Sequence, residues 1–275
     1  MVPQSPSSLL ESQLLTLGTV MQPEPTIYGP PANLKTRLED TYDKFASHPN
    51  GQISTHYSQQ VSYMYKFMTH LGTMRSQNPP GTLSDDERNG NVSLRGLRVL
   101  DVGCGSGRPA TSLCLDYGVD VTGVDLSACQ LELARKHLDS PRSSPDERGH
   151  LDLVHGDIMD QHFFPESFDG VVGLGSLAHL PKEEQTVFLH RAEKWLKPGG
   201  LLMIKITTDE VDRKEKMVSV GHQQGRLYWS GWGEEKMLQV LGSLGFAILD
   251  KESNANVDGL SELKYTWVIA KKSGL

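Results

Sequence analysis

Residues 97–107 have the sequence LRVLDVGCGSG, in which a short apolar run, predicted to be a buried strand, leads directly into a glycine-rich turn. Glycine has no Cβ, so it lets the backbone bend tightly and brings bare amides close to a ligand. In open α/β sheets, ligands bind beyond the carboxyl ends of the strands. The turn therefore indicates a ligand site, although alone it also fits NAD, FAD or a tight loop without a ligand.

The spacing of the glycines narrows the choice of ligand. A dinucleotide fingerprint has glycines at its first, third and sixth positions, so that a pyrophosphate meets a helix N-terminus. Here the sixth position is Arg108, and Asp101 stands just before the turn. This arrangement favours a nucleoside without a pyrophosphate that carries an ammonium group, as S-adenosylmethionine does.

Two further acids follow the next two predicted strands. Asp125 comes 22 residues after Gly103 and is placed to accept hydrogen bonds from ribose hydroxyls. Asp157 is placed to accept one from an adenine amino group, and Leu126 and Ile158 are placed to sandwich the ring. For either acid, the alternative is a helix N-cap.

Short apolar strands alternate with helical segments from residue 97 onward, which predicts an α/β fold with a mostly parallel sheet covered on both faces. The last two strands, 246–249 and 265–270, have no helix between them, so we expect their pairing to be antiparallel. We divide the chain into a flexible or lid-forming segment (1–32), a helical cap and linker (33–92) and a core (93–275). The stretch 207–232 is long for a connector, and we interpret it as a substrate-lid insertion.

Composition excludes several classes of partner. The net charge of -7 over 275 residues and the lack of a Lys/Arg cluster disfavour nucleic acid. The three cysteines show no metal-ligand spacing, so we expect no metal site and a reducing, cytoplasmic location. No apolar run approaches the roughly 20 residues that cross a bilayer, so no membrane partner is expected. The oligomeric state stays open.

Five segments in order resemble the motif series of the class I (Rossmann-like) S-adenosylmethionine-dependent methyltransferases, particularly their small-molecule branch. The segments are VLDVGCGSG (99–107), VTGVDLS (121–127), HGDIMD (155–160), FDGVVGLGSLAHLP (168–181) and LKPGGLLMI (196–204). The resemblance covers about residues 95 to 210. It implies a three-layer sandwich with a seven-stranded, mostly parallel sheet whose last strand is antiparallel, and an N-terminal helical cap.

The resemblance also implies a set of cofactor contacts. Carried over by position, the methionine part would contact Asp101, Gly103, Gly105 and Gly107, and the nucleoside would contact Asp125, Leu126, Asp157 and Ile158. The end of the fourth strand would offer backbone groups at Gly173 and Leu174. In related enzymes N-terminal helices cap the cofactor, which makes Tyr42 and Tyr57 the candidate aromatic contacts there; both also fit a core role.

The implied activity is methyl transfer from S-adenosylmethionine, with S-adenosylhomocysteine as product, to a small molecule, O-methylation being narrowly favoured. Aligning the reactants supplies most of the rate, and a base helps only where the methyl acceptor loses a proton. His179, just beyond the fourth strand, is the candidate base, with a structural role as the alternative.

The lid insertion offers a candidate substrate wall, whose aromatics alternatively only seal the lid: Arg226, Tyr228, Trp229 and Trp232. Four other functions stay open. They are N- or S-methylation of a metabolite, methylation of a protein, non-catalytic or regulatory binding of S-adenosylmethionine, and an NAD-dependent oxidoreductase, against which Arg108 and the motif series count. The sequence does not identify the methyl acceptor.

Overall fold

The computed structural model describes residues 30–47, 57–76, 94–139, 148–253 and 260–274 of the chain. Most of the segment 1–32, which we expect to be flexible or to form a lid, lies outside these residues. No helix in the described ranges is long and apolar enough to cross a membrane.

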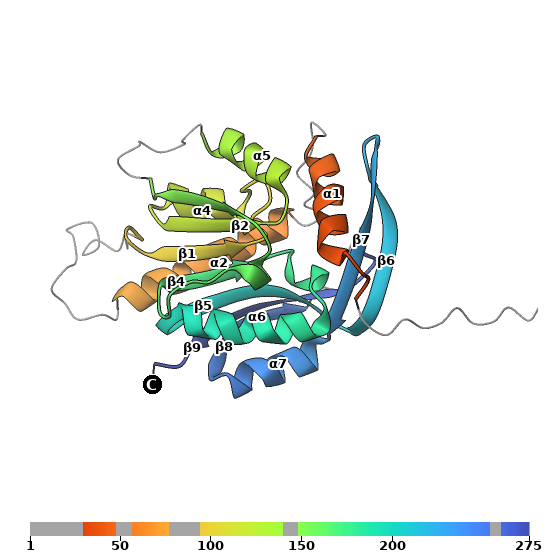
Figure 1. Ribbon diagram of the computed structural model, residues 1–275. Coiled ribbons are helices and arrows are strands. Elements are labelled where there is room, and N and C mark those ends of the chain that lie inside the picture. Colours follow the sequence, from red (N-terminus) through yellow and green to blue (C-terminus); the bar gives the residue numbers. More distant parts are fainter. Residues whose placement is uncertain (1–29, 48–56, 77–93, 140–147, 254–259, 275) are drawn as a thin grey trace, which may run out of the picture.

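A seven-stranded sheet forms the centre of the fold, in the spatial order β3-β2-β1-β4-β5-β9-β8 (Figure 1). The first five strands are parallel, whereas β9 runs antiparallel to both of its neighbours. This confirms the predicted sheet, including its antiparallel end. The strands are β1 (Arg98–Val102), β2 (Asp120–Asp125), β3 (Leu151–His155), β4 (Phe168–Gly173), β5 (Leu196–Thr207), β8 (Phe246–Ser253) and β9 (Tyr265–Lys272).

Helices cover both faces of the sheet because strand residues alternate between two apolar cores. One core joins Leu100, Val171 and Ile204 to helices α6 (Lys182–Trp195) and α7 (Glu234–Ser243). The other joins Val99, Val172 and Met203 to α2 (Tyr57–Ser76), α4 (Ala110–Asp116) and α5 (Ala128–Leu138). The result is the expected three-layer arrangement.

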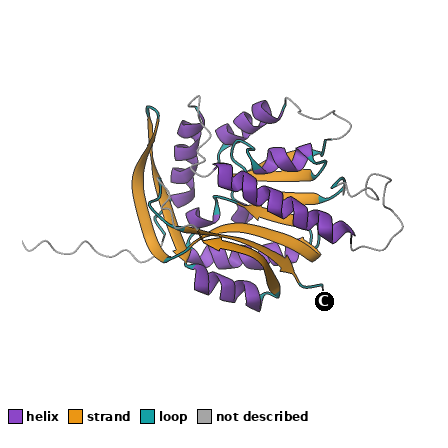
Figure 2. Cartoon of the chain, turned by 180° about the vertical axis from the view of Figure 1, so that it is seen from behind, coloured by secondary structure: helices purple, strands orange, loops and turns teal. Residues whose placement is uncertain are grey.

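Residues 207–232 form a two-stranded antiparallel ribbon, β6 (Glu210–Val220) and β7 (Gln223–Trp232). Both views show this ribbon at one side of the molecule, beside helix α1 (Leu34–Ala46) (Figures 1 and 2). Leu38 and Phe45 of α1 pack into one apolar cluster with Leu227 of β7. The approach is close at Gly225, where a Cβ would lie 2.3 Å from Cγ2 of Thr41.

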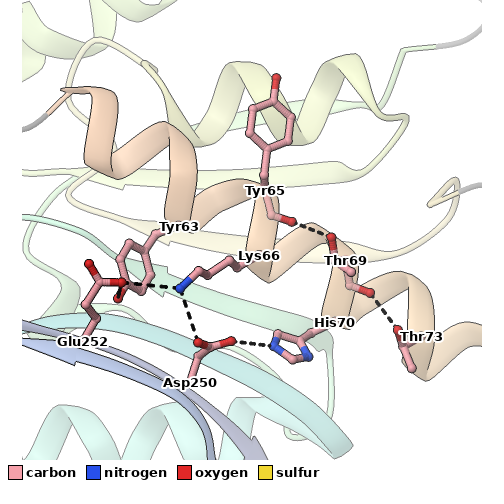
Figure 3. Close-up of polar contacts among 8 residues, drawn as sticks. All are labelled: Tyr63, Tyr65, Lys66, Thr69, His70, Thr73, Asp250 and Glu252. Atoms are coloured by element: carbon pink, nitrogen blue, oxygen red, sulfur yellow. Dashed lines mark hydrogen bonds and ion pairs between the residues drawn. The ribbon is translucent and has the colours of Figure 1, made fainter.

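A polar cluster holds α2 against the edge strand β8 (Figure 3). Lys66 lies between Asp250 and Glu252, with Nζ 3.4 and 3.5 Å from their carboxylate oxygens, and His70 contacts Asp250 at 3.1 Å. Tyr63 donates a hydrogen bond to Glu252 at 2.9 Å, and burial together with this carboxylate raises the pKa of Tyr63. Because these contacts join two elements far apart in the chain, they fix the position of α2 over the sheet.

Candidate active site

A cavity opens at the carboxyl ends of β1, β2 and β4, where the strand order reverses. Open α/β sheets bind their ligands at such a reversal. The cavity lining brings together most of the residues that the sequence singled out: Asp101, Gly103, Gly105, Asp125, Leu126, Asp157, Ile158, Leu174, Tyr42 and His179.

The glycine-rich turn after β1 needs its glycines for two different reasons. Gly103, Gly105 and Gly107 have φ of 70°, 54° and 77°, the left-handed region that glycine adopts without strain. A Cβ on Gly103 would lie 2.6 Å from Cβ of Ser176, whose hydroxyl donates to the Val102 carbonyl at 2.6 Å. Gly107 instead faces α5, where a Cβ would lie 2.7 Å from Leu138, and it does not line the cavity.

Asp101 places a carboxylate in the cavity wall at the end of β1. Its side chain is almost fully buried, and Oδ2 accepts a hydrogen bond of 2.6 Å from the Thr111 hydroxyl. Burial raises the pKa of Asp101 to about 6; hydrogen bonds from Thr111 oppose the shift, and the charge of Asp125 adds to it. A carboxylate in such surroundings favours a cationic partner.

Asp125 ties the glycine turn to β2. Oδ2 accepts from the Gly105 amide at 2.7 Å, and Oδ1 accepts from the Ser127 amide at 2.9 Å. Burial raises the pKa of Asp125, while these backbone hydrogen bonds lower it. The Ser127 hydroxyl caps α5 by accepting from the Gln130 amide at 3.1 Å.

The two carboxylate oxygens of Asp157 make different contacts. Oδ1 accepts from the Met159 amide at 3.0 Å, so this acid caps the short 3₁₀ helix η1 (Ile158–Asp160), which was its alternative role. Oδ2 lies 2.9 Å from Nζ of Lys35, which also contacts Glu184 at 2.5 Å. The lysine therefore connects helix α1 to the β3 end of the cavity.

His179 lies on the 3₁₀ helix η2 (Leu177–His179), between α1 and the β6–β7 ribbon. Its Nε2 is 2.7 Å from Oη of Tyr42, and its Nδ1 is 2.6 Å from the carbonyl oxygen of Tyr228. The Trp229 ring is tilted against it, with 5.8 Å between ring centroids. Tyr42 and His179 both line the cavity, Tyr42 on α1 and His179 on η2.

Several predicted contacts do not line the cavity. Tyr57, at the start of α2, is 44% exposed, and Gln60 lines the cavity in its place. Gly173 is enclosed by Leu177, whose Cδ1 would lie 2.8 Å from a Cβ there. Gly173 is the last residue of β4 and pairs with β5 inside the sheet, whereas Tyr57 is the first residue of α2 and is turned toward solvent.

The four predicted substrate residues also lie away from the cavity lining. Arg226 is exposed, Tyr228 and Trp229 pack in the cluster between α1 and the ribbon, and the indole of Trp232 donates to the Lys182 carbonyl at 2.8 Å. These packing contacts match the alternative role, in which the aromatics seal the ribbon onto the body. A direct substrate contact by any of the four stays a prediction.

Sequence reasoning missed the polar residues that close α1 over the cavity. Asp43 accepts from the Ser127 hydroxyl at 2.5 Å and from the Cys129 amide at 3.1 Å, and the Gln130 side chain donates to the Tyr42 carbonyl at 3.5 Å. Lys35 adds its contact to Asp157. No local motif marks these residues, because each contact joins segments far apart in the chain.

Comparison with known proteins agrees with this geometry. Residues 99–200 match a family model described as a methyltransferase domain. The O-methyltransferase rstn1 of Aspergillus nomiae is 34% identical over 112 residues, which are 41% of this chain and 47% of that protein. A sterol 24-C-methyltransferase of Clavispora lusitaniae is 30% identical over 167 residues, 59% of this chain and 43% of that protein. The chain thus spans less than half the length of these two relatives.

Among solved structures, the magnesium protoporphyrin IX methyltransferase of Synechocystis PCC 6803 with bound SAH has the same fold. It is 16% identical, with a TM-score of 0.55 over 87% of this chain and all of that one (100%). The motif series, the sheet order and the family match agree on one class: residues 99–200 match a methyltransferase domain, and the chain has the class I, Rossmann-like methyltransferase fold.

Proposed function

We propose that this protein transfers a methyl group from S-adenosylmethionine to a small-molecule acceptor, and that the acceptor atom is a hydroxyl oxygen. The observation that carries the proposal is the pair of carboxylates, Asp101 and Asp125, at the ends of two adjacent strands in one cavity. Their surroundings disfavour anions and favour a ligand with a positive charge and hydroxyl donors.

The residues of the cavity fit S-adenosylmethionine part by part. Asp101 with the exposed backbone at Gly103 would hold the ammonium-bearing methionine part, and Asp125 would accept from the ribose hydroxyls. The apolar side chains of Leu126 and Ile158 would hold the adenine, with Asp157 at its edge. When bound, this group supplies a methyl carbon that its sulfonium makes electrophilic.

A dinucleotide fits the same residues poorly. The pyrophosphate of NAD needs backbone N–H groups at a helix N-terminus. Here Pro109 is the N-cap of α4 and has no N–H, and the Gly105 amide already donates to Asp125. Two nearby carboxylates would also repel the phosphates.

His179 supports a hydroxyl as the atom that is methylated. An alcohol or phenol must lose its proton on methylation, whereas a thioether need not. His179 lies in the cavity with its ring held at both nitrogens. Of the two relatives described above, rstn1 is named as an O-methyltransferase, which agrees with this choice.

We place the reaction in the cytoplasm, with no nucleic-acid partner. Cys104, Cys114 and Cys129 are all free thiols, which fits a reducing compartment, and the net charge of -7 opposes binding to phosphate backbones.

Transfer of an isotope-labelled methyl group to a panel of phenols, alcohols, amines, thiols and peptides tests the proposal. We expect label in one or more hydroxyl compounds. Label confined to amines, thiols or peptides would contradict O-methylation. Tight binding of S-adenosylhomocysteine with no transfer to any class would show a non-catalytic binder.

A further inference from the structure

We infer that Tyr42 takes the proton from the hydroxyl of the methyl acceptor, and that His179 stands behind Tyr42 as the final proton acceptor. This inference rests on the proposed O-methylation. It assigns a proton-transfer role to a residue that the resemblance had suggested only as a cofactor contact. The observation that carries it is the hydrogen-bonded chain from Tyr42 through His179 to the Tyr228 carbonyl.

The direction of this chain follows from the groups at its ends. A backbone carbonyl can only accept, so Nδ1 of His179 carries a hydrogen and donates it to the Tyr228 oxygen. In the neutral imidazole, Nε2 is then the acceptor. The Tyr42 hydroxyl therefore donates to Nε2 across the 2.7 Å that separates them. The neutral ring is held in the tautomer whose basic nitrogen faces Tyr42.

Three elements fix this geometry. Tyr42 comes from α1, His179 from η2, and the Tyr228 carbonyl from β7. The Tyr42 ring meets the imidazole edge-on at 5.6 Å, and Trp229 lies against the imidazole. Because Nε2 is already engaged by the phenol, an incoming hydroxyl meets the Tyr42 oxygen first. A phenolic oxygen accepts one hydrogen bond while it donates another, so Tyr42 can pass a proton on.

The proton and electron balance of the step is complete. As the acceptor oxygen forms its bond to the methyl carbon, the carbon–sulfur bond of the donor breaks and the electron pair stays on sulfur. The hydroxyl proton moves to Oη of Tyr42, and the Tyr42 proton moves to Nε2 of His179. The positive charge lost at sulfur reappears on the imidazole, whose Nδ1–H remains bonded to the Tyr228 carbonyl.

The neighbours of this pair indicate the chemical class of the methyl acceptor. Leu38, one turn before Tyr42 on α1, and Leu180, directly after His179, both line the cavity. An uncharged compound that carries its hydroxyl on an apolar skeleton fits these two walls.

Two kinds of measurement test the inference. In ¹⁵N NMR of the histidine-labelled protein with S-adenosylhomocysteine, we expect His179 in the tautomer with hydrogen on Nδ1, and an Nε2 signal that shifts on Tyr42→Phe. A neutral ring with its hydrogen on Nε2 would overturn proton transfer from Tyr42 to His179.

Kinetics with an apolar hydroxyl compound from the panel give the second measurement. We expect Tyr42→Phe and His179→Gln each to lower kcat by about 100-fold or more, and the double variant to lose no more than either single one. We compare kcat at saturating S-adenosylmethionine, so that a weaker hold on the cofactor in either variant does not enter the comparison. Unchanged kcat in Tyr42→Phe with a large loss in His179→Gln would overturn proton transfer through Tyr42 but not the proposed O-methylation. Failure of the wild-type protein to bind S-adenosylhomocysteine would instead overturn the proposed function.

Discussion

At the scale of single residues, burial decides what Asp101 does near neutral pH. Because its pKa is raised to about 6, this carboxyl group changes its charge within the range in which most proteins remain folded. Above that pKa, an ionised carboxylate stands in the cavity wall and attracts an ammonium group. Below it, the neutral acid loses that attraction.

We therefore predict that affinity for S-adenosylhomocysteine rises by about tenfold between about pH 5 and about pH 7.5, as Asp101 ionises. Calorimetric titrations across this range would measure the rise. Asp101→Asn should bind more weakly at neutral pH and show a smaller rise. The same pH dependence in this variant as in wild type would remove Asp101 as its source.

Residues next to strand ends were the ones that sequence reasoning could place. Asp101 and Asp125 lie at the ends of β1 and β2, and Gly103 directly follows β1, so the strands fix the position of all three relative to the sheet. Lys35 and Asp43 were missed because they reach the cavity only through the packing of α1. Sequence spacing holds no information on such a contact.

At the scale of elements, α1 is the part that closes the cavity. It contacts the N-cap of η1 through Lys35, η2 through Tyr42 and the start of α5 through Asp43. Arg37 adds an ion pair to Glu215 of the ribbon at 2.6 Å. These side chains come from one helix but reach four different elements, so α1 can hold a ligand beneath it only while it stays docked.

Lys35→Met removes the ion pairs to Asp157 and Glu184 while keeping the aliphatic stem. Since partly exposed pairs contribute about 0.5–1 kcal/mol, we expect S-adenosylhomocysteine to dissociate about two- to fivefold faster. Stopped-flow displacement would measure the rate. Lys44→Met, on the exposed side of the same helix, is the matched control and should leave it unchanged. Equal effects of the two variants would argue against a closing role for Lys35.

Gly225→Ala tests the contact between α1 and the ribbon. Its new Cβ would lie 2.3 Å from Cγ2 of Thr41, so α1 must shift, at a cost of about 1–3 kcal/mol in the free energy of unfolding. Gly242→Ala in α7 meets no atom within 4 Å and should be neutral or stabilising. Thermal unfolding compares the two, and hydrogen exchange should show faster exchange of α1 in Gly225→Ala alone. A stable Gly225→Ala protein with unchanged α1 exchange would contradict this packing.

The two strands of the β6–β7 ribbon were not predicted from the sequence. Residues 210–220 carry Arg213, Lys214 and Lys216 among acids, a composition typical of a solvated segment. In the structure one face of the ribbon meets solvent and the other packs on α1. The segment of β6 therefore carries few apolar residues, and we interpreted residues 207–232 only as a long insertion. The inner strands β1 and β4 are instead buried almost throughout, and their continuous apolar runs made them recognisable in the sequence.

At the scale of the whole molecule, side-chain pairs between distant elements stabilise the fold against acid. Glu234, at the start of α7, accepts from Lys251 of β8 and Thr266 of β9, and the hydrogen bond from Lys251 does most to lower its pKa to about 2. Hydrogen bonding to His70 lowers the pKa of Asp250 in the α2–β8 cluster (Figure 3). A depressed carboxyl pKa stabilises the fold above the unfolded-state pKa, and this contribution is lost as the pH falls toward the folded-state value.

Glu234→Gln should therefore lower the Tm near neutral pH, and its difference from wild type should shrink as the pH falls from about 5 to about 3. Thermal melts over this range provide the measurement, with the exposed neighbour Glu235→Gln as control. A difference that stays constant with pH would show that the charge of Glu234 is not the cause.

The direction of the strands was the property of the whole molecule that the sequence predicted best, because the alternation of strands and helices and the missing helix before β9 constrain it. The identity of the methyl acceptor, by contrast, could not be predicted from the sequence. It depends on which side chains α1, η2 and the ribbon bring together, and these three elements meet only in the folded chain.

The central claim is that the cavity at the ends of β1 and β2 binds the methyl donor. Calorimetric titration of S-adenosylhomocysteine and of NAD into the wild-type protein and Asp125→Ala tests it most directly. We predict that wild type binds S-adenosylhomocysteine but not NAD, and that Asp125→Ala, still folded by its thermal melt, binds neither. Tight binding of NAD with no binding of S-adenosylhomocysteine would contradict it.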